Sequence, residues 1–144
     1  MYDTILFPTD GSELSEQGID HAVSLARAYD AELHALFVIN QAVYAGHPND
    51  MDREKIQNQL RESGSRSLEE LEAAAEEAGV PLSSTVLSGI PYEQIIEYVE
   101  SNDVDLVVMG THGRSGLDRM LLGSTTEKVL RLSPVPVHCV PRDD

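Results

Sequence analysis

The stretch that decides the fold begins at Val104 as VDLVVMGTHG (residues 104–113) and continues nine residues later as GSTTEKVL (residues 123–130). Its apolar beginning predicts a buried strand, and its end predicts the start of a helix. The glycines between them permit positive φ angles and let the backbone approach an anion, while the unpaired N–H groups of a helix start point at such a ligand. This order of strand, glycine-rich loop and helix predicts a nucleotide-binding protein.

Two other phosphate-binding motifs are absent from the sequence. No glycine is followed directly by lysine, which excludes a Walker A loop, and no G-x-G-x-x-G pattern follows a predicted strand. A long irregular turn that merely needs flexible residues is the alternative interpretation. Three glycines and a hydroxyl residue in one register, between a strand and a helix, favour the phosphate-binding loop.

The motif resembles that of the universal stress protein family, whose ATP-binding members carry glycine, two residues, glycine, nine residues, glycine, and then serine or threonine. Gly110, Gly113, Gly123 and Ser124 stand at these positions with the same spacing. Two further stretches are similar to family segments, namely ILFPTDGS at residues 5–12 and PVPV at residues 134–137. The resemblance follows the whole chain in order, which makes it more specific than a glycine pattern alone.

Apolar and polar segments alternate so that five strands are expected, separated by four helices. The strands are predicted at residues 4–7, 32–39, 82–87, 104–109 and 137–140, and the helices at residues 12–29, 51–78, from 91 onward, and 124–132. Gly64 weakens the second helix locally. This order predicts a single-domain α/β fold over residues 1–144, a doubly wound parallel sheet with helices on both faces. The family resemblance, and not the periodicity, implies the strand order 3-2-1-4-5.

In a sheet of that order the first and fourth strands meet at the switch point, and ligands bind beyond their carboxyl ends. The resemblance implies that Asp10 contacts the ribose or a phosphate-bound divalent metal, that Pro8 and Thr9 flank the nucleoside, and that Val38, at the end of the second strand, offers backbone contacts to adenine. The expected nucleotide-binding residues are Pro8, Thr9, Asp10, Val38, Met109, Gly110, His112, Gly113, Arg114, Gly123, Ser124, Thr125 and Thr126.

Several of these residues have a purely structural alternative. STTE at residues 124–127 is also a capping box, in which the serine and the glutamate satisfy each other's backbone N–H. Asp10 also begins a good turn into a helix without any ligand. Arg114 is the best-placed cation for phosphate charge, or equally an ordinary exposed arginine. His112 has no acidic or cysteine partner at metal-ligand spacing, so we expect it near the ligand without a metal.

The chain is acidic, with 25 Asp and Glu against 10 Lys and Arg and a formal net charge of −15. Such a charge repels the phosphates of nucleic acids and anionic lipids, so neither is an expected partner. The acidic residues are scattered and lysines are few, which favours a halophilic protein adapted to high salt over an ordinary acidic one. No apolar run has the length of a membrane span and no signal pattern opens the chain, so we expect a cytoplasmic protein.

The glycine motif predicts a nucleotide-binding protein. The family resemblance implies an ATP-binding stress-response protein that acts as a nucleotide-dependent sensor or switch, with ATP and Mg²⁺ as ligands and Asp10 at the metal. Without a P-loop lysine the residues allow slow hydrolysis at most, so we do not expect an enzyme with rapid turnover. A dimeric interaction module of the same fold that uses no nucleotide is the alternative, although such members typically lose the glycine pattern. An adenylyltransferase-like enzyme would need insertions for which 144 residues leave little space.

The terminal segment PVHCVP at residues 136–141 is short, apolar and flanked by prolines, which predicts an edge strand. An exposed apolar edge associates with another chain unless it is covered. In the resembled family the last strand pairs antiparallel with its copy across a two-fold axis. The resemblance therefore implies a homodimer with Val137 and Cys139 at the interface, and a monomer whose prolines blunt the edge is the alternative. Cys139 itself is expected as a buried thiol.

Overall fold

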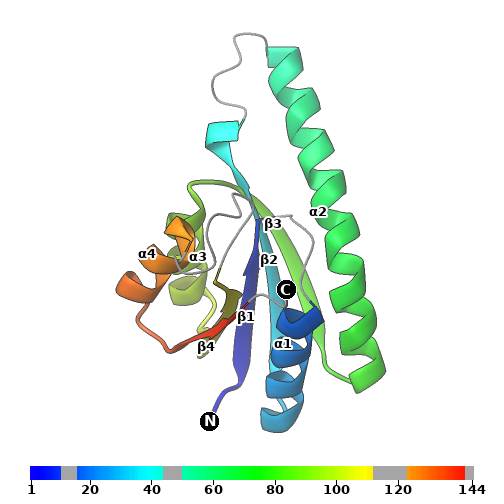
Figure 1. The fold of residues 1–144 in the computed structure, drawn as a ribbon, viewed down its shortest axis with the longest axis vertical. Helices are drawn as coiled ribbons and strands as arrows, with labels where there is room; N and C mark the ends of the chain where they lie inside the picture. Colours follow the sequence, from blue (N-terminus) through cyan, green and yellow to red (C-terminus); the bar gives the residue numbers. More distant parts are fainter. Residues whose placement is uncertain (11–15, 44–49, 112–122, 142–144) are drawn as a thin grey trace.

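Five parallel strands form one sheet in the order β3-β2-β1-β4-β5 in the computed structural model of the chain, which describes residues 1–10, 16–43, 50–111 and 123–141 (Figure 1). This confirms the predicted fold class and strand order. The elements are β1 (Thr4–Thr9), α1 (Glu16–Tyr29), β2 (Glu32–Asn40), the short 3-10 helix η1 (Gln41–Val43), α2 (Asp50–Ala78), β3 (Leu82–Gly89), α3 (Pro91–Ser101), β4 (Leu106–Gly110), α4 (Ser124–Leu132) and β5 (Val137–Val140).

Each face of the sheet has its own apolar core, because successive residues of a strand point to opposite sides. Ile5 and Phe7 of β1 pack in a cluster with α1 and α2, whereas Leu6 between them belongs to a cluster with α3 and α4. Figure 1 shows the same division, with α1 and α2 on one side of the sheet and α3 and α4 on the other. The central strands are therefore buried on both faces, so a ligand can reach them only at their ends.

The predicted elements agree with the observed ones except at some ends. α4 and β5 begin and end at the predicted residues. β2 is longer than predicted and reaches Asn40, because it stays paired with β3 as far as Asn40 opposite Gly89. The placement of Val38 at the end of this strand is therefore wrong, since it lies two residues inside. Ser12, the predicted start of the first helix, lies outside the described residues.

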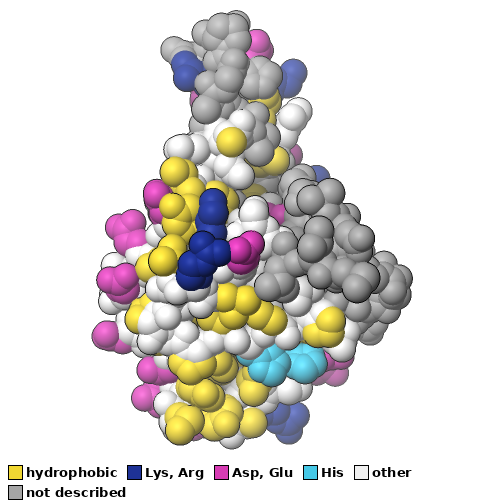
Figure 2. All heavy atoms as spheres, turned by 60° about the vertical axis from the view of Figure 1, so that its left-hand side comes forward, with side chains coloured by type: hydrophobic (Ala, Val, Ile, Leu, Met, Phe, Trp, Pro, Cys, Tyr) yellow, Lys and Arg dark blue, Asp and Glu magenta, His cyan; other side chains and the backbone are white. Residues whose placement is uncertain are grey.

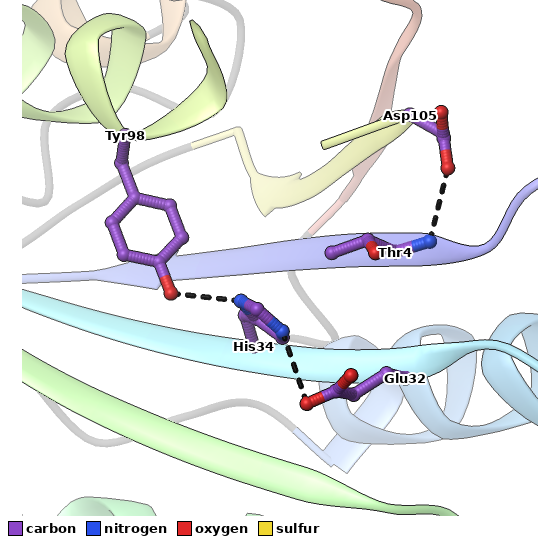
Figure 3. A network of polar contacts seen from close by, with 5 residues as sticks. All are labelled: Thr4, Glu32, His34, Tyr98 and Asp105. Carbon is purple, nitrogen blue, oxygen red and sulfur yellow. Dashed lines mark hydrogen bonds and ion pairs between the residues drawn. The ribbon is translucent and has the colours of Figure 1, made fainter. Parts of the chain in front are cut away.

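A carboxylate joins β1 and β4 at their amino ends. Oδ2 of Asp105, just before β4, accepts the backbone N–H of Asp3 at 2.8 Å and that of Thr4 at 3.0 Å. Figure 3 shows the bond to Thr4. Because one side chain satisfies two backbone donors from the other strand, it holds the two central strands together at this end of the sheet.

A second polar contact holds α3 on β2 at the same end of the sheet (Figure 3). Nδ1 of His34 is hydrogen-bonded to the Tyr98 hydroxyl at 2.7 Å. Its Nε2 lies 3.2 Å from Oε1 of Glu32, which is within ion-pair distance but without hydrogen-bond geometry. These contacts, with the Asp105 carboxylate, fix the amino ends of the strands.

Gly64 lets the long helix α2 lie directly on β2. The helix runs unbroken from Asp50 to Ala78, so the weak point that the sequence suggests does not interrupt it. A Cβ at position 64 would lie 2.1 Å from Cε2 of Phe37, a side chain that is 1% exposed. The packing against β2 therefore requires glycine here. Despite the length of α2, none of the helices in the described ranges is apolar enough along its length to cross a membrane.

We expect Gly64→Ala to lower the free energy of unfolding. Alanine is the better helix former by about 1 kcal/mol, but overpacking a core costs about 1–3 kcal/mol, and the added methyl would overlap a ring that has no room to move. Urea denaturation gives the comparison, with Ser65→Ala, an exposed neighbour in the same helix, as the control for propensity alone. A Gly64→Ala protein as stable as the Ser65→Ala protein would contradict this packing argument.

Candidate functional site

β1 and β4 are paired only near their amino ends. The register joins two residues of each strand and stops, Ile5 and Leu6 opposite Leu106 and Val107. β1 nevertheless stays paired with β2 as far as Thr9, and β4 stays paired with β5 as far as Gly110. Pro8, which has no N–H to donate, lies two residues beyond Leu6, the last β1 residue in the ladder to β4. This is the switch point of the sheet, the place where doubly wound folds bind their ligands.

Two hydrogen bonds close the base of the loop between β4 and α4. The N–H of Gly123 donates to the carbonyl oxygen of Thr111 at 2.7 Å, and the N–H of Thr111 donates to that of Val140 at 3.1 Å. The first bond joins the two ends of the segment 112–122, and the second ties the same point to the last residue of β5. The final glycine of the motif, Gly123, is thereby placed next to the end of β4.

Thr126 ties the first turn of α4 to β4. Its Oγ1 donates to the carbonyl oxygen of Gly110 at 2.9 Å, and the residue is only 3% exposed. The hydroxyl hydrogen is therefore committed within the protein, so the side chain positions the helix start. Together with the bond between Gly123 and Thr111, it fixes where α4 begins relative to the end of β4.

Gly123, and not Ser124, is the N-cap of α4. Gly123 has φ −63° and ψ 150° and no side-chain cap, and its carbonyl oxygen accepts the N–H of Glu127 at 3.0 Å. The alternative of a capping box is therefore wrong, because Ser124 is already the first helical residue. The carboxylate of Glu127 pairs instead with Arg131 one turn further along the helix.

The N–H groups of Ser124, Thr125 and Thr126 precede the first backbone hydrogen bond of α4. Such groups carry the partial positive charge of a helix start and are typical ligands of phosphate. The side chain of Ser124 is exposed and that of Thr125 half-buried. The carboxylate that could repel an anion, Glu127, is engaged with Arg131.

Three of the predicted residues lie together at the end of β1. Pro8 is buried within the strand, and Thr9 and Asp10 that follow are half-buried. Both Thr9 and Asp10 take part in polar interactions within the protein. No group of three or more His, Cys, Asp or Glu gathers as a metal site anywhere in the described part of the chain.

The predicted residues of β2 and β4 have buried side chains or none, so they would contact a ligand through their backbone atoms. Val38 is 2% exposed and lies one position beyond Phe37, the last β2 residue paired with β1. The side chain of Met109 is buried in the core cluster with α3 and α4, whereas Gly110 after it is exposed. The exposed glycine leaves the backbone at the end of β4 open to approach.

The sequence matches the model of the universal stress protein family over residues 1–141. The chain belongs to this family. The universal stress protein MJ0531 of Methanocaldococcus jannaschii is 39% identical over 140 residues, which cover 97% of this chain and 82% of that protein. The solved structure of MJ0577 from the same organism has a TM-score of 0.82 at 31% identity and covers 100% of this chain and 99% of that one. A universal stress protein in complex with cAMP has a TM-score of 0.69 at 26% identity, with coverage of 99% and 98%.

Family membership gives the glycine motif of this universal stress protein its context, but part of the motif is not described. His112, Gly113 and Arg114 lie outside the described residues, in the segment whose two ends Thr111 and Gly123 hold together. The structure therefore brings the first and last glycines of the motif to the carboxyl end of β4.

Sequence reasoning missed a histidine pair on this universal stress protein. Nδ1 of His21 in α1 lies 3.0 Å from Nε2 of His138 in β5. Burial, and then the neighbouring His21, lower the pKa of His138 below its usual value. The two residues are 117 positions apart, so only the fold brings them together. Cys139, expected as a buried thiol, is half-buried, and its burial raises the pKa of its thiol.

We expect Thr126→Val to loosen the base of the glycine loop. The substitution keeps the shape but leaves the Gly110 carbonyl without its donor, which should cost about 1–2 kcal/mol in the free energy of unfolding. It should also speed hydrogen exchange at the Gly123 amide, measured by NMR, because α4 is then less firmly held against β4. Thr126→Ser, which retains the hydroxyl, should leave that amide protected. Equal exchange in wild type and Thr126→Val would contradict the role given to this bond.

Proposed function

We propose that this universal stress protein binds an adenine nucleotide, ATP with Mg²⁺, and acts as a nucleotide-dependent sensor or switch. The observation that carries the proposal is the bond from Gly123 to Thr111, which sets the first turn of α4 beside the end of β4. The phosphates would lie against the N–H groups of Ser124, Thr125 and Thr126, and the exposed backbone of Gly110 would allow close approach.

The nucleoside would lie at the ends of β1 and β2. Pro8, Thr9 and Asp10 follow the point where β1 leaves β4, and Val38 lies just beyond the last β2 residue paired with β1. The complex of a related protein with cAMP supports an adenine nucleotide as the ligand class. Within this arrangement Asp10 would contact the ribose or a divalent ion on the phosphates.

The negative net charge of the protein is the reason why the proposal includes a cation. The protein carries a formal net charge of −15, which repels a nucleotide phosphate. Mg²⁺ would offset this repulsion and bind carboxylate and phosphate oxygens together. Arg114 and the partial charge of the α4 start would add to it. The scattered acidic charge itself supports the proposed adaptation to high salt, where screening shortens its range.

A binding role is favoured over rapid catalysis. Fast phosphoryl transfer needs positioned cations and a residue that orients the nucleophile, and the sequence offers no P-loop lysine. We therefore propose hydrolysis that is slow or absent, on one nucleotide-binding unit spanning residues 1–144. The second candidate is an interaction module that does not bind nucleotide. The half-buried edge strand β5 would favour this function if the glycine loop bound no nucleotide.

We expect wild-type protein to bind ATP in the micromolar range and Gly123→Val to lose that binding. Gly123 has φ −63° and ψ 150°, a conformation that valine also adopts, so the added bulk and not backbone strain should block the phosphates. Calorimetry at high salt measures the affinity, and a thermal melt confirms the fold of the variant. Ser124→Ala, which keeps all the N–H donors, should lose less. Unchanged ATP affinity in Gly123→Val would contradict the proposal that the phosphates bind at this loop.

We expect Asp10→Ala to weaken ATP binding more in the presence of Mg²⁺ than in its absence, because a hard cation on the phosphates requires an oxygen ligand. Asp10→Asn serves as the matched variant, since its amide oxygen can still bond a ribose hydroxyl but lacks the charge that holds the ion. Calorimetry with and without Mg²⁺ separates the two roles. Equal losses under both conditions would assign Asp10 to the ribose or to the turn.

We also propose a homodimer through β5, and expect Val137→Asp to convert it to a monomer. β5 pairs with β4 on one side, and Val137 is half-buried between prolines at 136 and 141. A two-fold contact is self-complementary, so a charge there acts twice. Sedimentation at high salt measures the assembly, with Met51→Asp on the exposed surface of α2 as the control and a cooperative melt as the test of folding. A dimer indifferent to Val137→Asp would exclude this interface.

A further inference from the structure

Two imidazoles from distant parts of the chain face each other on the α1 side of the sheet. His138 is opposite Val108 of β4, which belongs to the core cluster beneath α1, so its ring lies on that side. Nδ1 of His21 and Nε2 of His138 are 3.0 Å apart, and the ring centroids are 5.1 Å apart with planes inclined by 43°. Both residues are half-buried, and histidine side chains reach the surface in Figure 2 (cyan).

The separation of the two nitrogens suits a shared metal ion. Two imidazole nitrogens on a tetrahedral Zn²⁺, each bonded at its usual distance, lie about 3.3 Å apart. The observed pair is within a few tenths of an ångström of that value, so a small rotation of the rings would admit the ion. Without the ion, the N–H of one ring donates a hydrogen bond to the bare nitrogen of the other, and the metal would replace that hydrogen.

The surroundings of the pair attract a cation and hold the neighbouring thiol on the other side of the sheet. The net charge of −15 raises the local concentration of cations. Cys139 does not join the pair, because it is opposite Met109 and therefore faces the other side of the sheet.

We propose that His21 and His138 form a two-histidine site for a divalent transition ion of the Zn²⁺, Ni²⁺ or Cu²⁺ class, with water completing the coordination. Imidazole selects these borderline cations over Mg²⁺ and Ca²⁺. No third His, Cys, Asp or Glu joins the pair among the residues that the structure describes, so the described part of the chain supplies two nitrogen ligands. A bound ion would clip the edge strand β5 to α1. The pair shares no residue with the proposed nucleotide site, so the two proposals can be tested separately.

Zn²⁺ titration of metal-free, nucleotide-free protein by calorimetry at pH 7.5 tests the proposal. We expect saturable binding of one ion per chain, and a loss of affinity of about tenfold or more in both His21→Gln and His138→Gln, since even a residue that only supports a metal ligand contributes that much. His34→Gln, which alters the histidine bonded to Tyr98, should bind as wild type does. Zn²⁺ should raise the melting temperature of wild type but not of the two pair variants, and Mg²⁺ should raise neither.

Electron paramagnetic resonance with one equivalent of Cu²⁺ gives a readout on wild type that does not depend on the folding of any variant. We expect couplings to two imidazole nitrogens. No saturable Zn²⁺ binding by wild type would overturn the proposal, as would Cu²⁺ held by a single nitrogen. Affinity that survives in both His21→Gln and His138→Gln would place the ion elsewhere and overturn it equally.

Discussion

The rest of the structure depends on how briefly β1 and β4 are paired. A carboxylate at position 105 holds these two central strands together at their amino ends, and their ladder ends after two residue pairs. Beyond these pairs β1 remains paired with β2 and β4 with β5, so the two halves of the sheet continue while β1 and β4 separate from each other. The helices that follow these strands, α1 after β1 and α4 after β4, lie on opposite faces of the sheet, which makes this point its topological switch. The buried faces stabilise the fold, and we propose that the ligand binds where these two strands part.

The strand β5 connects the two sites that we propose. Its last residue, Val140, accepts the N–H of Thr111 at the base of the glycine loop, and two residues earlier His138 contacts His21. An edge strand of four residues, paired on one side with β4, depends on such contacts for its position. Anything that fixes or releases β5, whether an ion at the histidine pair or a second copy of the chain, would act on the strand that anchors the loop. This gives a small protein a physical route by which assembly and ligand binding could influence each other.

Most of the fold could be predicted from the sequence because its signals are local. The apolar runs, together with the glycines and prolines between them, predicted the five strands and the four α-helices but not the short 3-10 helix η1. The strand order came from family resemblance and is confirmed. The errors arose where tertiary contacts override local pattern. Gly64 reads as a helix breaker but makes room for Phe37, and STTE reads as a capping box although Gly123 begins the helix. β2 runs past Val38 because β3 continues beside it. The histidine pair has no sequence signal at all, since only the topology brings α1 to β5.

The central claim is that an adenine nucleotide binds where β1 and β4 part and α4 begins. Mapping backbone amide chemical shifts by NMR during titration with ATP and Mg²⁺ tests it most directly, because every amide reports separately. The account predicts saturable shifts at Gly110, Gly123, Ser124 and Thr125 and at Thr9 and Asp10, with β3 and the outer surface of α2 unchanged. Saturable shifts centred on another surface, or none at millimolar ATP, would contradict it.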